Sequence, residues 1–143
     1  MPSDRERITE IMDTFYRILS GSAVEAHDWD GLHRLFVPGA SILALGRSGD
    51  PMGSLQAEDV GHYVGRLASS LTGRAFFERG FDYEVSVAGS IAHVNSRYEA
   101  SATPDFAPIL KSGTNMIHLV RKGSDWRIAG MLYEDDPETS ESG

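Results

Sequence analysis

Cysteine is absent from this chain of 143 residues. Its absence excludes disulfides, thiolate nucleophiles, cysteine-ligated zinc and iron–sulfur clusters. Such a composition suits a reducing compartment, and we expect a cytoplasmic protein. Long apolar runs are also absent: none approaches the roughly 18 residues of a membrane span, and the N-terminal residues lack the apolar segment of a signal peptide. We therefore expect no association with a membrane.

Basic residues are scarce. The chain has 13 lysines and arginines against 21 aspartates and glutamates, which gives a formal net charge of −8. Proteins that bind nucleic acid usually carry a basic patch, so no nucleic-acid partner is expected. The composition, 41% hydrophobic and 24% charged, is that of a globular protein. We expect a single domain over residues 1–136, followed by a disordered acidic tail over 137–143.

Apolar spacing predicts a first helix over residues 4–20 and a third over 57–71. In both segments the apolar residues recur at three- and four-residue intervals, which is typical of one buried helical face. Ser3, with Glu6 three residues later, predicts a capping box at the start of the first helix.

A second, shorter helix is expected to begin at Asp28. Its carboxylate is placed to cap the helix, and this explains the residue better than a catalytic role does. Residues 37–39 contain a proline that cannot continue a helix, so the helix is expected to stop there. Strands are then expected over residues 40–47 and, more briefly, over 52–55.

The hydrophobic period changes to two in the second half of the chain. This alternation, with glycine-containing turns between the segments, predicts an antiparallel meander of long strands. The expected strands cover residues 81–87, 91–102, 113–121 and 126–134. Three helices followed by such a sheet give an α+β fold, in which the helices cover one face of a curved sheet. A cone of this kind has an open mouth where a ligand pocket is expected.

This order of elements resembles the nuclear transport factor 2-like superfamily, which includes ketosteroid isomerase, scytalone dehydratase and the SnoaL-like polyketide cyclases. The residues that carry the resemblance are DWDGLHRLFVPGA at 28–40, FFE at 76–78 with VSVAGSIAHVNSRYEA at 85–100, and KSGTNMIHLVR at 111–121 with DWRI at 125–128. The resemblance implies a cystatin-like cone over residues 5–135 and dimers formed through the sheet. The superfamily hosts many functions, so the resemblance is specific for the fold rather than for an activity. Within it, the chain is placed with an uncharacterised subgroup.

The resemblance places Tyr16 where ketosteroid isomerase keeps the tyrosine of its oxyanion hole. The position of the isomerase's catalytic aspartate falls near residues 43–45, which hold no carboxylate, and that of its protonated aspartate falls near Ile117. Steroid isomerisation by that mechanism is therefore not expected. Two interpretations of Tyr16 stay open: a hydrogen-bond donor to a ligand oxygen, or a core tyrosine with a backbone partner.

Histidine is the residue type best suited to acid–base chemistry near neutral pH. The candidates are His33 and His62, one on each of the two later helices, and the alternative for each is a surface or capping role. His93 falls on the strand face opposite the apolar residues and is discounted. No two histidines are four residues apart, the spacing typical of helical metal sites, so we expect no metal and no cofactor.

Polar and aromatic side chains are expected to share the cavity of the cone. Tyr98, Asn115 and Tyr133 offer hydroxyl and amide groups, and Trp29 and Tyr63 are the expected aromatic contacts of a ligand. The alternative is a filled core in which these polar groups are satisfied internally.

Two functional hypotheses follow. The first is a lyase or isomerase that acts on a small apolar molecule, either a carbonyl or a ring compound. In this hypothesis Tyr16 or Tyr98 polarises the substrate, and His33 or His62 moves a proton. The second is a non-catalytic ligand-binding or protein-interaction module.

A homodimer through the outer face of the sheet is expected in either case. This face is predicted to carry His93, Asn95, Arg97 and Glu99 on one strand and Thr114, Met116, His118 and Val120 on the next.

Overall fold

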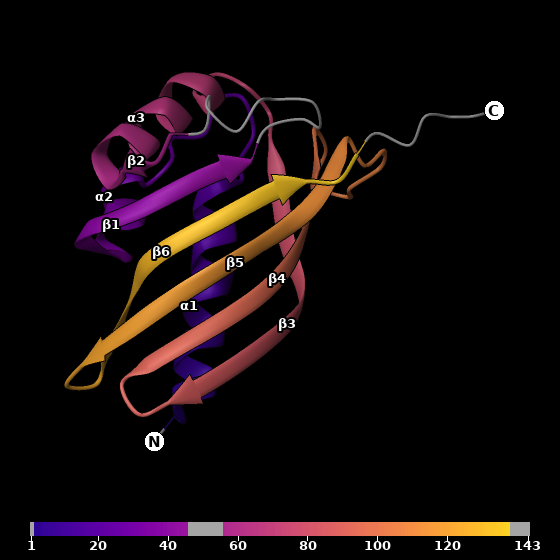
Figure 1. Cartoon of the computed structure of the whole chain (residues 1–143). Coiled ribbons are helices and arrows are strands. Elements are labelled where there is room, and N and C mark those ends of the chain that lie inside the picture. The colour runs from indigo at the N-terminus through magenta and orange to yellow at the C-terminus, as the bar shows by residue number, and fades with distance from the viewer. Residues whose placement is uncertain (1, 46–55, 138–143) are drawn as a thin grey trace.

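The structure is a computed structural model that describes residues 2–45 and 56–137. Its helices are α1 (Asp4–Leu19), α2 (Trp29–Arg34) and α3 (Val60–Leu71). Its strands are β1 (Phe36–Leu45), β2 (Glu58–Asp59), β3 (Phe77–Ala88), β4 (Ile91–Ser101), β5 (Lys111–Lys122) and β6 (Asp125–Asp135). Among the described residues these strands form one sheet in the order β2-β1-β6-β5-β4-β3 (Figure 1).

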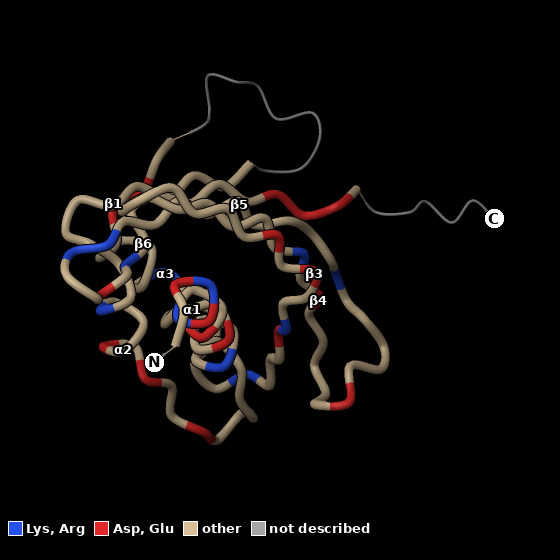
Figure 2. Tube along the Cα trace, turned by 90° about the horizontal axis from the view of Figure 1, so that it is seen from below, with Lys and Arg blue, Asp and Glu red and all other residues tan. Residues whose placement is uncertain are grey.

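The sheet curves around α1, which lies within its concave side (Figure 2). Strands β3 to β6 form the expected antiparallel meander. Strand β1 then adds to β6 in parallel, a pairing that the hydrophobic pattern did not predict. The helices thus cover one face of a curved sheet, and the predicted α+β cone is confirmed.

Helix α1 begins as the sequence predicts. The hydroxyl of Ser3 accepts a hydrogen bond from the backbone N–H of Glu6, and the Glu6 carboxylate accepts one from the N–H of Ser3. The apolar stripe of the helix is buried at Ile8, Met12, Phe15, Tyr16 and Leu19. The capping box therefore sets the helix start, and burial of the stripe against the sheet holds the helix in place.

The predicted end of the second helix is wrong. Helix α2 is capped by Asp28 as expected, but it ends at Arg34 and the chain enters β1 at Phe36. Pro38 therefore lies inside a strand. The pairing of β1 with β6 is irregular between Phe36 and Ser41, so the missing N–H of Pro38 interrupts no regular ladder.

The start of the third helix is also corrected. Helix α3 begins at Val60, three residues later than predicted, because the Asp59 carboxylate caps it by accepting from the His62 N–H at 2.8 Å. The residue before the cap, Glu58, lies in β2 and pairs with Ile42 of β1. The predicted short strand at 52–55 and most of the predicted tail lie outside the described residues.

A β-bulge in β3 reverses which residues of that strand face the helices. The register of β3 with β4 shifts between Phe81 and Glu84, and Asp82 within this step has a φ of 53°. After the bulge, the odd-numbered Val85 packs towards the core. Before the bulge, the even-numbered residues face inward, because one extra residue inverts the alternation of a strand.

Gly80 illustrates this inversion. A Cβ atom at this position would collide with the ring of Tyr16, so the absence of a side chain allows β3 to approach α1 closely.

We predict that Gly80→Ala destabilises the protein by about 1–3 kcal/mol, the usual cost of overpacking a filled core. The matched control is Gly65→Ala on α3, where no described atom lies within 4 Å of the new Cβ. That control is expected to stabilise by about 0.5–1 kcal/mol, since alanine is the better helix former. Urea unfolding of both variants checks the pair, and equal effects of the two substitutions would contradict the close contact with Tyr16.

Candidate functional site

A cavity of about 390 Å³ lies between α3, the C-terminal end of α1 and the sheet. Its apolar wall includes Phe15, Leu19, Tyr63, Leu67, Leu71 and Phe76. Its uncharged polar groups include Tyr98, Asn115 and Tyr133. A mostly apolar cavity of roughly 300–1,000 Å³ with a few polar groups is typical of small-molecule sites.

Glu78 places a carboxyl group in this cavity. Its backbone is fixed by Ser20, the C-cap residue of α1, whose hydroxyl accepts from the Glu78 N–H at 2.9 Å and donates to the carbonyl of Tyr16 at 2.9 Å. Among the described residues, no donor forms a hydrogen bond with the carboxyl group itself. Strand β3 thus presents to the cavity an acid whose hydrogen-bonding capacity is unused.

The surroundings of Glu78 change its acidity. Burial raises the pKa of this carboxyl group to about 7, with Lys111 opposing the rise and Asp135 adding to it. A carboxyl group with a pKa near the working pH can both take and return a proton, which is the requirement for a general acid or base.

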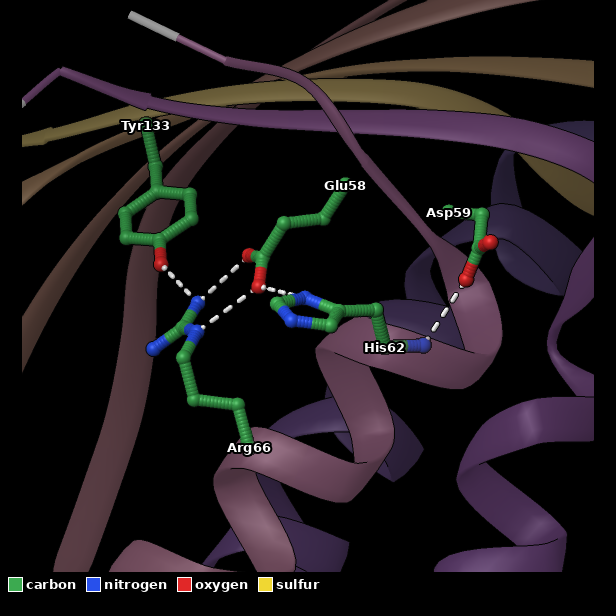
Figure 3. A network of polar contacts seen from close by, with 5 residues as sticks. All are labelled: Glu58, Asp59, His62, Arg66 and Tyr133. Atoms are coloured by element: carbon green, nitrogen blue, oxygen red, sulfur yellow. Dashed lines mark hydrogen bonds and ion pairs between the residues drawn. The ribbon is translucent and has the colours of Figure 1, made fainter. Parts of the chain in front are cut away.

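Tyr133 is held at the cavity by a network that starts at the surface (Figure 3). Arg66 donates to the Tyr133 hydroxyl at 3.0 Å and to the two carboxylate oxygens of Glu58 at 2.8 and 2.9 Å. The Nδ1 atom of His62 lies 2.6 Å from the same carboxylate, and the hydrogen bond from Arg66 is the main reason that the pKa of Glu58 is lowered. Because Arg66 donates to the oxygen of the Tyr133 hydroxyl, the O–H of that hydroxyl is available to donate a hydrogen bond to a ligand.

Asn115 and Tyr98 are oriented by hydrogen bonds to other side chains. The amide of Asn115 donates to the Tyr16 hydroxyl at 2.7 Å, and that hydroxyl lies 2.7 Å from Ser96. The hydroxyl of Tyr98 donates to Asp135 at 2.6 Å. Burial raises the pKa of Tyr16 to about 12, so the phenol stays protonated and joins Asn115 to Ser96 as a fixed link.

Four of the five predicted ligand contacts line the cavity: Tyr63, Tyr98, Asn115 and Tyr133. Trp29 does not. Its ring stacks on His27 with a centroid distance of 4.6 Å, on the short α2 segment away from the cavity.

The three predicted catalytic residues lie outside the cavity lining. Tyr16 is buried behind Asn115, and His33 is exposed on α2. His62 is exposed on α3 and reaches the cavity only through Glu58 and Arg66. The expectation that a histidine side chain enters the cone is therefore corrected, because on both helices the neighbouring residues, Leu32 and Tyr63, take the inward positions.

Sequence reasoning missed Glu78 because it followed an alternation that the bulge interrupts. The pattern of residues 81–87 places odd positions inward, and its continuation towards the N-terminus turns Glu78 outward. The one local signal is Asp82, since aspartate is among the few residue types that adopt a positive φ readily.

Two kinds of structure are absent from residues 2–45 and 56–137. No three histidine, aspartate or glutamate side chains gather there in a way that could hold a metal ion. No helix in these ranges is long and apolar enough to cross a membrane.

Comparison with known proteins identifies the fold. A protein of unknown function with a cystatin-like fold from Nostoc punctiforme superposes with a TM-score of 0.72 at 10% identity, covering 95% of each chain. An NTF2-like protein with a cystatin-like fold from Novosphingobium aromaticivorans gives 0.71 at 15% identity, covering 96% of this chain and 84% of that one. The chain has the cystatin-like fold of the NTF2-like proteins.

A further NTF2-like structure, from Cytophaga hutchinsonii, gives a TM-score of 0.70 at 11% identity and covers 94% of this chain and all of the other. No family model and no curated protein matches the chain. At these identities the likeness to NTF2-like proteins concerns the fold, and function has to be argued from the cavity.

We predict that Glu78 makes the protein less stable as pH rises. The unfolded chain releases the proton near its ordinary pKa of 4.5, whereas the folded protein holds it until about 7. The contribution of Glu78 to the free energy of unfolding is therefore fully present below pH 4.5 and is lost as pH rises through 7. Between pH 5 and 8, the free energy of unfolding should fall by about 1–3 kcal/mol more in wild type than in Glu78→Gln.

Urea unfolding at several pH values measures this difference. Glu84→Gln is the control, because Glu84 is exposed on the other face of the same strand and should leave the wild-type profile unchanged. Parallel profiles for wild type and Glu78→Gln would show that the carboxyl group ionises normally.

Proposed function

We propose that this NTF2-like protein binds a small carbonyl or ring compound in its cavity and acts on it as a lyase or isomerase. The observation that carries the proposal is Glu78, a carboxyl group without a described hydrogen-bond partner, inside a largely apolar cavity and with its pKa raised to about 7. Acids with a perturbed pKa that line a cavity are concentrated at functional sites.

The reaction would use two groups of the cavity. The ionised Glu78 removes a proton from a carbon next to the substrate carbonyl, and the electron pair of the broken C–H bond moves onto the carbonyl oxygen. Tyr133 donates a hydrogen bond to that oxygen. Arg66, which itself donates to the Tyr133 hydroxyl, adds a positive charge that stabilises the developing negative charge. In an isomerase the electron pair then returns from the oxygen to form a bond from another carbon to the proton that Glu78 gives back. In a lyase the same pair expels a leaving group from the neighbouring carbon, and Glu78 gives its proton to that group.

The apolar wall supports this chemistry. Phe15, Leu19 and Leu71 come from two different helices and exclude water from one side of the cavity. In such surroundings charge on the substrate oxygen is stabilised more strongly than in water.

The proposed activity predicts catalysed hydrogen exchange. Ring ketones that stabilise the protein in a thermal-shift screen should lose the proton next to their carbonyl to D₂O, as followed by ¹H NMR. Replacement by Glu78→Gln should slow the exchange by about 100-fold or more, the usual contribution of a general base. Glu84→Gln is again the control and should exchange at the wild-type rate.

The same measurements separate the two functional hypotheses. Binding of ring ketones without exchange would favour a non-catalytic ligand-binding module. Exchange that persists unchanged in Glu78→Gln would show that another group is the base.

We also propose that the protein forms a homodimer through the outer face of the sheet. The structure places Met116 and Val120 on this face, 41% and 36% exposed, together with Ile91 and Leu132. Five long strands about 4.8 Å apart and about 33 Å long present about 800 Å². A stable interface needs roughly that area from each partner, and it would remove these apolar side chains from water.

The dimer predicts a specific response to charge. Met116→Lys combined with Val120→Lys should give a monomer by light scattering at micromolar concentration, because two lysines per protomer would be buried against each other. Val24→Lys changes an apolar side chain that is 94% exposed in the segment before α2, and should leave the dimer intact. A wild-type monomer, or a dimer that survives the double substitution, would contradict this interface.

A further inference from the structure

The charge of the cavity is opposite to that of the whole protein. The chain carries a net charge of −8, yet of the four charged side chains in the described part of the chain that line the cavity, three are cations. These are Arg66 on α3, Arg74 in the turn after α3 and Lys111 at the start of β5; the fourth is Glu78. A cluster of one sign around a cavity attracts ligands of the other sign.

The three cations differ in how far their charge is already compensated. Arg66 is fully engaged with the Glu58 carboxylate and Tyr133. The side chain of Arg74, by contrast, makes a single long hydrogen bond among the described residues, to the carbonyl of Ser70 at 3.4 Å. No described carboxylate lies within ion-pair distance of Arg74.

Lys111 is also weakly compensated. Its Nζ atom lies 3.7 Å from Oδ1 of Asp135, and this oxygen already accepts the hydrogen bond from Tyr98 at 2.6 Å. A contact of that length is too long for a hydrogen bond, and its charge attraction is screened because both groups are about half exposed. Two cations at the cavity therefore keep most of their capacity to bind an anion.

We propose that the ligand of this cavity carries a carboxylate group, which Arg74 and Lys111 bind while its ring or carbonyl portion lies against the apolar wall. The inference rests on the proposed function and narrows its substrate class to organic acids. A guanidinium and an ammonium group together form charge-assisted hydrogen bonds with a carboxylate, and these are stronger than bonds between neutral groups.

A ligand carboxylate bound by Arg74 and Lys111 would also change the pKa of Glu78. Lys111 lowers the pKa of Glu78, and a ligand anion beside Lys111 offsets that influence. Binding of the acid near pH 7 is therefore accompanied by uptake of a fraction of a proton by Glu78, and the complexes in which Glu78 stays ionised are the ones that react. A neutral ligand in the same cavity leaves Lys111 uncompensated and causes less proton uptake.

The test uses a panel of mono- and bicyclic ring ketones, each prepared as a ring carboxylate and as the matching carboxamide. Isothermal titration calorimetry at low salt should show the carboxylates binding about tenfold or more tightly, as expected for one charge-assisted contact. In Arg74→Gln and Lys111→Gln this preference should fall to within about threefold, while carboxamide affinity stays at the wild-type level. Arg127→Gln, which removes a cation paired with Asp125 outside the cavity, is the matched control and should keep the full preference.

Proton uptake gives a second readout. Titrations in two buffers with different ionisation enthalpies should show uptake with the carboxylates in wild type and none in Glu78→Gln.

The outcomes distinguish the two proposals. Equal binding of carboxylates and carboxamides would overturn the inference of an anionic ligand and leave a neutral carbonyl compound as the substrate. A preference that survives both cavity substitutions but falls in Arg127→Gln would place the anion elsewhere and also overturn it. Failure of every member of the panel to bind in either form would contradict the proposed function as well.

Discussion

The contact of Tyr16 with the sheet is the constraint on which the cavity depends. Its ring packs against Gly80 of β3, and its hydroxyl joins Ser96 of β4 to Asn115 of β5. One side chain of α1 thus touches three neighbouring strands, which fixes the depth at which the helix lies in the curve of the sheet. The floor of the cavity follows from this depth, because Asn115 faces the cavity while it is bound to Tyr16.

The bulge in β3 and the end of α1 act together on the same site. The bulge turns the even-numbered residues of the first part of β3 inward, and this brings both Gly80 and Glu78 to the helix side. Ser20 then binds the backbone of Glu78 directly, so the helix terminus and the strand are joined at that residue. A local irregularity of the strand therefore supplies the close approach of Tyr16 and, among the described residues, the one carboxyl group of the cavity lining.

The sequence allowed much of the fold to be predicted, because helical stripes and strand alternation are local patterns. The capping box at Ser3, the cap at Asp28 and the four-stranded meander all follow from residues close together in the chain. The parallel pairing of β1 with β6 has no local signal, and Pro38, which the sequence predicts to end a helix, lies inside a strand. In the site, Tyr98 and Asn115 were predicted from alternation, whereas Glu78 required knowledge of the bulge, and Arg66 and Lys111 required knowledge of which elements meet.

The parallel pairing of β1 with β6 also has a consequence for the order in which the protein folds. Ser41 pairs with Gly130, 89 residues later in the chain, whereas each hairpin of the meander joins strands that are close in sequence. Loop closure over such a separation is slow, and during synthesis β1 has no parallel partner until almost the whole described chain has been made. The apolar residues of β1, Ile42 among them, must stay exposed or be shielded by the helices for that period. Of the described strands, the last to be synthesised is β6, which pairs with both β1 and β5, so the sheet of this cystatin-like domain is completed only after β6 has been made.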